Sequence, residues 1–432
     1  MRTSMKLFSE EALLFCLSLC LFGLSSAHAG SMLIDNVKVV NGTKDSSYDR
    51  VDVLMDGGKI ISVMEEIAVS DGVTVIDGTG KVLTAGLFNS ETQMGVLEIG
   101  AVSETRDDGS DDERFTASFN PIEAFNPSSV VIPYNRMHGL THTLVIPSND
   151  VSMIAGKASI VNLSQSSKSV EVKSAGVVVA LGEKGSALKG GSRAVALASL
   201  TEVLEDARDY AANKDAYNRG ARREHAVSRA DLEALIPVVQ RRTPLIVYVE
   251  RASDIERVLA FAKKQNVSLI LVGVSEAWML AEQIAKAQVP VIIDPIRNLA
   301  TSYEALGSRL DNAKILNDAG VRLLFSGMGA KETHNAYLVR QSAGNAVANG
   351  LPYHVAIAAL TSNPSAVFGL SGYGEIKAGS KATAVLWDGD PLEMSASVEM
   401  VLINGQSFAL ESRATRLRDR YFEHLKSVTD TE

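Results

Sequence analysis

Short apolar runs alternate with amphipathic stretches through the middle of the chain. Between the runs, apolar residues recur at helical spacing, as in 253–266, where Ser253 and Glu256 have the spacing of a capping box and Asn266 ends the pattern. Strands that alternate with helices predict a parallel α/β barrel. The runs of strand character are 83–95, 143–146, 177–181, 245–250, 268–272, 289–294 and 321–325, and residues 155–163 are either the eighth strand or a hairpin over the barrel mouth.

A second pattern occupies the two ends of the chain. Residues 32–82 and 377–405 contain short β segments separated by turn residues such as Gly57 and Gly58, which is typical of successive hairpins. Residues 412–425 have the character of a helix and follow the second of these regions. The ends of the chain therefore predict β structure of a different kind from the barrel strands.

The first residues have the features of a leader. Arg2 and Lys6 precede an apolar run over 12–24, and Ala29 ends a small-x-small pattern typical of a signal-peptidase site. A membrane anchor is the alternative, but it needs about 20 apolar residues. We therefore predict that residues 1–29 are a signal peptide, cleaved near Ala29, and that the mature protein is periplasmic. Both cysteines lie in this leader, so the mature chain forms no disulfide.

Composition limits the partners more than the fold. The chain has 432 residues, of which 46% are hydrophobic, and its formal net charge is -9. Such a length suits a barrel with an accessory domain. A net acidic surface disfavours nucleic acid and anionic lipid, and no second apolar run of membrane-spanning length follows the leader. We expect no nucleic-acid partner and no membrane association once the leader is removed.

One stretch, residues 83–95, carries a family resemblance. It is an apolar run that ends in small and polar residues, as the first strand of a (β/α)8 barrel does where it meets the catalytic mouth. It resembles the opening strand of the amidohydrolase superfamily, which reads Pro-Gly-Leu-Ile-Asp-x-His-x-His. Gly86 and Leu87 are kept, Asn89 takes the place of the aspartate, and Glu91 and Gln93 take the places of the two histidines.

The resemblance covers nearly the whole mature chain. Residues 360–364 keep a flanking motif, and the C-terminal β region is similar to the family's Gly-x-Ile-x-x-Gly-x-x-Ala-Asp signature, with Thr383 in place of the aspartate. The fold that this implies is a TIM-like (β/α)8 barrel beside a small β-sandwich to which both ends of the chain contribute. The implied units are residues 85–373 for the barrel, 30–84 and 374–411 for the sandwich, and 412–432 for a terminal helix.

Members of this family activate water on Zn or another divalent metal, and the resemblance implies where the ligands would lie. Val178, Gly273 and Met328 offer no oxygen or nitrogen ligand in their side chains, and no His-x-His pair occurs in the sequence. We therefore predict no cofactor and no metal ligand, while a ligand set of an unfamiliar kind stays open. The implied positions are Glu91, Gln93, Val178, Tyr248, Gly273 and Met328.

A site can exist without metal, because strand ends build the mouth of a barrel in any case. The candidate catalytic residues are Glu91, Glu250 and His334, since two neighbouring carboxylates can act as acid and base. The candidate substrate-binding residues are Gln93, Tyr248 and Asp294. The structural alternatives are a core ion pair between Glu91 and Arg251 or another cation, a Tyr248 that fills the volume of a lost metal, and a His334 that is an ordinary loop residue.

The loop 104–113 is dense in carboxylates and follows the first barrel strand. Its spacing does not match an EF-hand, so we expect a mobile, solvated lid rather than a calcium site. Such a loop repels anions, which predicts a neutral or cationic ligand.

Two hypotheses of function follow. The first is an exported amidohydrolase-family protein, similar to imidazolonepropionase-like enzymes, that by resemblance hydrolyses C–N bonds other than peptide bonds in a cyclic amide or dipeptide-like substrate. Its replaced metal ligands make it degenerate, so remaining catalysis stays open. The second is a non-catalytic protein that binds a small molecule or serves as the partner subunit of an intact homologue. Homo-oligomers and hetero-oligomers both stay open.

Overall fold

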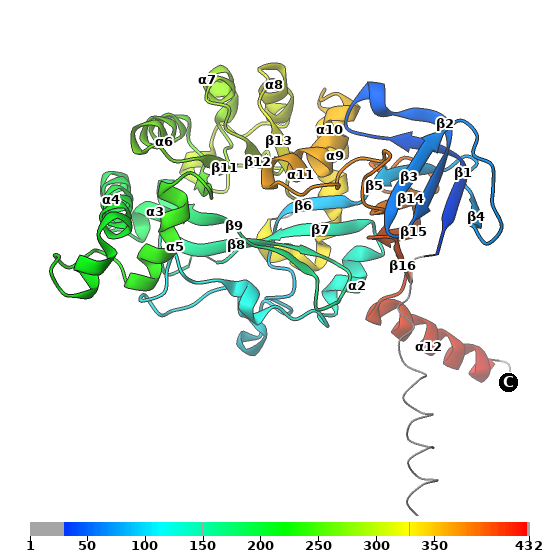
Figure 1. Ribbon diagram of the computed structural model, residues 1–432, viewed down its shortest axis with the longest axis horizontal. Coiled ribbons are helices and arrows are strands. Elements are labelled where there is room, and N and C mark those ends of the chain that lie inside the picture. Colours follow the sequence, from blue (N-terminus) through cyan, green and yellow to red (C-terminus); the bar gives the residue numbers. More distant parts are fainter. Residues whose placement is uncertain (1–29, 149, 328, 430–432) are drawn as a thin grey trace, which may run out of the picture.

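The computed structural model describes residues 30–148, 150–327 and 329–429, which form two β-sheets with surrounding helices (Figure 1). One sheet is the barrel and the other belongs to a smaller β-domain at one side of it. The predicted signal peptide lies outside the described residues. Within the described part, no helix is long and apolar enough to cross a membrane.

The barrel sheet has 8 strands that follow one another in sequence order from β6 to β13. The last strand contacts the first, so the sheet nearly closes. This architecture confirms the predicted fold class. The strands are β6 (Leu87–Thr92), β7 (Leu140–Val145), β8 (Ile154–Asn162), β9 (Val170–Ala180), β10 (Leu245–Val249), β11 (Leu269–Gly273), β12 (Val291–Ile293) and β13 (Leu323–Phe325).

Strand β8 departs from the wholly parallel sheet that we expected. It pairs antiparallel with β7, where His142 faces Asn162, and antiparallel with β9, where Ile154 faces Val179. The residues on either side of it, 146–153 and 163–169, are too few for a crossover helix, which needs a dozen or more. Residues 155–163 are therefore the eighth strand, entered and left by hairpins.

Apolar side chains fill the barrel from alternate positions of its strands. Phe88, Val178 and Ile246 belong to this inner core, whereas Leu87 and Val247 belong to the larger core between the strands and the helices. The helices that cover the sheet are α2 (Val131–Arg136), α3 (Gly182–Ala187), α4 (Arg193–Asn218), α5 (Arg229–Val239), α6 (Ala252–Gln265), α7 (Ala281–Lys286), α8 (Asn312–Asp318), α9 (Val339–Ala348), α10 (Tyr353–Leu360) and α11 (Ser362–Phe368).

Helix α6 shows which local signals were informative. Its end was predicted correctly, because Asn266 adopts a left-handed conformation with φ of 50° and terminates the helix. The predicted capping box of Ser253 and Glu256 was wrong, because Ser253 is not the N-cap residue. The helix begins at Ala252, and Arg251 at its N-cap makes no side-chain capping bond.

The β-domain combines the two ends of the chain around its own core, which includes Ile34, Val53 and Leu386. Strand β1 pairs with β4 through its first half and with β5 through its second half, and the sheet is one hydrogen-bonded unit. Helix α12 (Arg413–Thr429) follows this domain and extends away from the body (Figure 1). The strands are β1 (Met32–Val40), β2 (Tyr48–Asp56), β3 (Lys59–Met64), β4 (Thr74–Asp77), β5 (Val82–Ala85), β14 (Ala384–Trp387), β15 (Val398–Ile403) and β16 (Gln406–Phe408).

Candidate functional site

At the mouth of the barrel, the side chains of Glu91 and Tyr248 connect the ends of β6 and β10. The register of β6 against β7 shifts between Asn89 and Thr92, and Glu91 lies in this irregular segment. Tyr248 belongs to the inner core of the barrel, and its hydroxyl donates a hydrogen bond of 2.9 Å to Glu91 Oε1. Ser326, just after β13, also hydrogen-bonds the Glu91 side chain. Three strands therefore meet at one carboxyl group.

Burial is the largest influence on the pKa values of Glu91 and Tyr248. It raises the pKa of Glu91 above its ordinary value, although the hydrogen bonds from Tyr248 and Ser326 and the charge of Arg297 act in the opposite direction. Burial and the neighbouring charge of Glu91 raise the pKa of Tyr248 well above its ordinary value. The phenol is therefore protonated at neutral pH and remains a hydrogen-bond donor.

Glu250 follows β10 and is held by its neighbours. Its Oε2 accepts hydrogen bonds from Ser275 N (2.9 Å) and Ser275 Oγ (2.6 Å), and its Oε1 accepts one from Arg297 Nη1 (2.9 Å). Of the expected alternatives for Glu91, the pair with Arg251 is wrong, because Arg251 Nη2 donates instead to Asp254 Oδ1 at 2.9 Å. The cation whose charge acts on Glu91 is Arg297. Sequence reasoning missed Ser275 and Arg297, which lie in the loops after β11 and β12.

Gln93 links the strand end to the acidic loop. It is buried, its Nε2 donates to Asp108 Oδ2 at 2.8 Å, and its backbone N–H donates to Thr333 Oγ1 at 2.9 Å. Arg106 also donates to Asp108, at 3.3 Å. The structure therefore gives Gln93 a tethering role, and its predicted role in substrate binding stays a prediction.

The two remaining candidates differ in their relation to Glu91. Asp294 follows β12, accepts a hydrogen bond of 2.9 Å from Ser342 Oγ, and its charge acts on Glu91. His334 lies in the 3-10 helix Ala330–Leu338 and is exposed, and its Nε2 is 3.0 Å from Asn335 Nδ2. Asp294 thus belongs to the electrostatic surroundings of Glu91, and a catalytic role for His334 stays a prediction.

The side chains at the implied metal positions do not match the family's donor set. Val178 lies in the apolar inner core of the barrel, and Met328 lies outside the described residues. Gly273 has φ of +86°, and a Cβ on it would lie 2.5 Å from Glu250 Oε1. Among the described residues, no group of three or more His, Cys, Asp and Glu is arranged to hold a metal ion.

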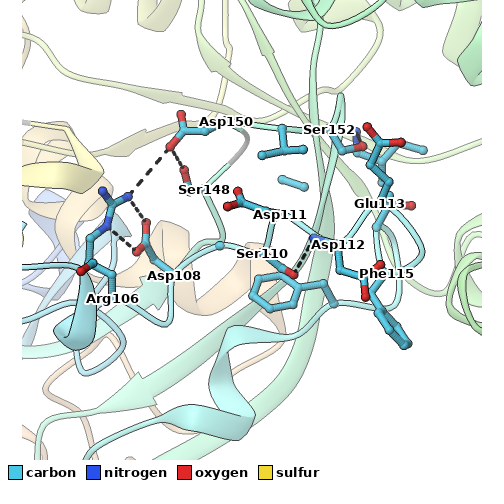
Figure 2. Close-up of a pocket in the computed structure, with 17 residues that line it drawn as sticks. Arg106, Asp108, Ser110, Asp111, Asp112, Glu113, Phe115, Ser148, Asp150 and Ser152 are labelled. Carbon is cyan, nitrogen blue, oxygen red and sulfur yellow. Dashed lines mark hydrogen bonds and ion pairs between the residues drawn. The ribbon is translucent and has the colours of Figure 1, made fainter.

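A cavity of about 330 Å³ lies between the acidic loop and the connection from β7 to β8, and its lining includes Asp108, to which Gln93 donates (Figure 2). This volume is within the range of small-molecule sites. Figure 2 shows Arg106 between Asp108 and Asp150 at one side of the cavity. Part of the wall is apolar and comes from Phe115 and Ile154. The carboxylates that line the cavity are Asp108, Asp111, Asp112, Glu113 and Asp150.

Buried carboxylates hold the acidic loop and the residues that follow it. Within the loop, the buried Asp108 accepts hydrogen bonds from Gln93 and Arg106. Just after the loop, Thr116 and Ser118 donate four hydrogen bonds of 2.6 to 3.0 Å from their backbone and hydroxyl groups to the buried Asp231 of α5. The predicted lid therefore forms a wall that two buried carboxylates hold in place.

Comparisons with known proteins agree with the fold. Residues 196–408 match the model of the amidohydrolase family. The chain is 21% identical over 388 residues to amidohydrolase tasK of Hapsidospora irregularis; the match covers 82% of this chain and 39% of the relative, so the chain spans less than half of that protein. An amidohydrolase from Thermotoga maritima MSB8 has a TM-score of 0.78 at 23% identity, covering 88% of this chain and 99% of its own. Molinate hydrolase has a TM-score of 0.55 at 16% identity, covering 89% and 95%.

A barrel whose first strand ends in the mouth, together with a β-domain made from both chain ends, defines the amidohydrolase type of TIM barrel. The family model, the curated relative and the structural neighbours together support the assignment to the amidohydrolase superfamily that the resemblance of the first barrel strand indicated.

Proposed function

We propose that this amidohydrolase-family protein binds a small molecule at the barrel mouth and does not perform metal-dependent hydrolysis. The observation that carries the proposal is that the strand ends are bonded to one another: Glu91 accepts a hydrogen bond from Tyr248, and Glu250 accepts three from Ser275 and Arg297. Carboxylates whose lone pairs already accept protein donors are poorly available to a metal ion.

The cavity supports a neutral or cationic ligand. Its carboxylates face a volume whose apolar wall includes Phe115 and Ile154, which suits a compact molecule with an amine and a hydrocarbon part. Asp111, Glu113 and Asp150 are the exposed carboxylates of this lining. Asp150 is paired with Lys184, and Asp112 is paired with Arg114. We infer that Asp111 and Glu113 select against anions.

Hydrolysis without metal is the second candidate. The raised pKa of Glu91 favours it, because a carboxyl that keeps its proton toward neutral pH can serve as a general acid. The substrate would then be a small amide or urea. Such compounds are suggested by the names of structural neighbours, among them phenylurea hydrolase B, which has a TM-score of 0.52.

The test starts from the full chain expressed with its leader. Mass spectrometry of the purified protein checks cleavage near Ala29 and export, and its metal content is measured without chelator. Thermal shift is then measured with primary amines, guanidines, neutral amides and carboxylic acids. We expect stabilisation by one of the first three classes and no turnover of amide substrates. Stoichiometric metal together with amide hydrolysis would overturn the proposal.

Two cavity variants make the screen specific. Asp111→Asn and Glu113→Gln each remove one carboxylate from the cavity, and Asp71→Asn removes one from an exposed turn of the β-domain. For a cationic hit, we expect each cavity variant to raise Kd about 2- to 5-fold, as for a solvent-screened ion pair, and Asp71→Asn to leave it unchanged. Equal affinities in all three variants would place the ligand elsewhere.

A further inference from the structure

Carboxylates from three barrel strands approach one another at the mouth without a metal. Glu91, Glu250 and Asp294 lie at or just after the ends of β6, β10 and β12. Asp294 raises the pKa of Glu91, and Glu250 raises the pKa of Tyr248. Both negative charges therefore act on the hydrogen-bonded pair of Glu91 and Tyr248. Like charges that converge at a partly buried site are unfavourable without a counter-charge. In the family that counter-charge is a divalent ion.

Arg297 is in a position to supply it here. Its Nη1 is 2.9 Å from Glu250 Oε1, and its backbone N–H donates to the Asp294 carbonyl at 3.1 Å. Its positive charge lowers the pKa of both Glu91 and Tyr248. A single guanidinium therefore acts on Glu91, Tyr248 and Glu250, and the backbone of the same residue is bonded to Asp294.

The Glu250 carboxylate occupies space that a metal ligand at position 273 would need. Ser275, just after β11, holds this carboxylate where a side chain on Gly273 would project. A side chain at position 273 would require the Glu250 carboxylate to leave its present position, because a Cβ there would be 2.5 Å from Glu250 Oε1.

We propose that Arg297 is the resident cation of the barrel mouth, in place of the family's divalent ion, and that a divalent ion reaches these carboxylates only when Arg297 is removed. This inference rests on the proposed function, since it explains how the mouth holds together without hydrolytic metal. The Glu250 side chain is only 17% exposed, but Arg297 is 44% exposed, so we expect a modest effect on stability.

The test compares Arg297→Met with Arg297→Lys, because lysine keeps the charge. Melting is followed with and without manganese(II), which prefers oxygen ligands. We expect Arg297→Met to lower Tm by about 2–4 °C and Arg297→Lys to lower it less. Manganese(II) should raise the Tm of Arg297→Met alone, and titration calorimetry should detect binding to that variant and not to the wild type.

Adding Glu250→Gln to Arg297→Met tests the pairing itself. The double variant should recover part of the lost Tm and respond less to manganese(II), because one unpaired carboxylate is gone. Should Arg297→Met fail to fold, the double variant is expected to fold. Equal Tm values for the methionine and lysine variants, an equal manganese response in all proteins, or no recovery in the double variant would overturn the inference. None of these readouts uses the cavity ligand, so failure of the ligand screen is a separate result.

Discussion

The hydroxyl of Tyr248 and Oε1 of Glu91 are 2.9 Å apart and connect β10 to β6 across the barrel mouth. By the resemblance, both residues stand at positions where family members carry histidine ligands of a metal. A phenol and a carboxyl group make a direct hydrogen bond, so this pair needs no metal ion between its members. In this protein, a hydrogen bond connects the two strand ends that a metal ion would connect in the family.

Replacing Tyr248 with phenylalanine should destabilise the protein. The variant keeps the ring in the inner core but leaves the partly buried Glu91 without one of its donors, which costs about 1–3 kcal/mol. Urea unfolding at neutral pH measures the change. Tyr303→Phe is the matched control, because Tyr303 is 86% exposed, and it should be neutral. Equal free energies of unfolding for Tyr248→Phe and wild type would mean that the bond contributes nothing to stability.

Replacing Glu91 with glutamine should change how stability depends on pH. The folded-state pKa of Glu91 is raised above 4.5, so the folded protein binds its proton more tightly than the unfolded chain does. The resulting contribution to stability is fully present below pH 4.5 and is lost as pH rises through the folded-state pKa. The free energy of unfolding of the wild type, relative to Glu91→Gln, should therefore fall as pH rises above 4.5.

This comparison uses chemical denaturation at several pH values. Glutamine cannot titrate, so the difference between the two curves isolates the Glu91 carboxyl group. A difference that stays constant with pH would show that Glu91 has an ordinary pKa in the folded protein.

The sequence was informative where a single strand or helix decides the outcome. The apolar runs predicted the barrel strands because both faces of each strand are buried, and Asn266 predicted the end of α6 because it tolerates φ above zero. The direction of β8 was not readable from its own residues, since only the lengths of its two connections exclude a crossover.

The composition of the site was harder to predict, because it depends on loops rather than on periodic elements. Glu91, Tyr248 and Asp294 were accessible to reasoning as strand-end residues. Ser275 and Arg297 lie beyond the strands, where side-chain direction follows from loop geometry that no periodicity encodes. The only sequence feature that pointed to Arg297 was its position three residues after Asp294. That spacing does not indicate how close Arg297 lies to Glu250.

Replacing Gly273 with alanine should be costlier than the same change at Gly72. Both glycines have φ of +86°, so alanine is strained at either position by about 1 kcal/mol. A Cβ on Gly72 meets nothing within 4 Å, whereas one on Gly273 displaces the Glu250 carboxylate from Ser275 and Arg297. We expect an additional loss of about 1–3 kcal/mol for Gly273→Ala. Equal losses in the two variants, measured by urea unfolding, would show that the Glu250 carboxylate moves freely.

Replacing Glu171 with glutamine should weaken the opposite end of the barrel. Burial alone would raise the pKa of Glu171, but hydrogen bonds and charge from His142, with further bonds from Tyr373 and Asn162, lower it to about 2. The stability that Glu171 contributes is therefore present above its ordinary pKa of 4.5 and is lost as pH falls through about 2. At neutral pH, Glu171→Gln should lower the free energy of unfolding by about 1–3 kcal/mol, and its difference from wild type should vanish at low pH.

The control is Glu123→Gln. The Glu123 side chain is 65% exposed in a surface ion pair, so this variant should change the free energy of unfolding little at any pH. A loss in Glu171→Gln that persists unchanged down to pH 2 would assign the effect to packing rather than to charge.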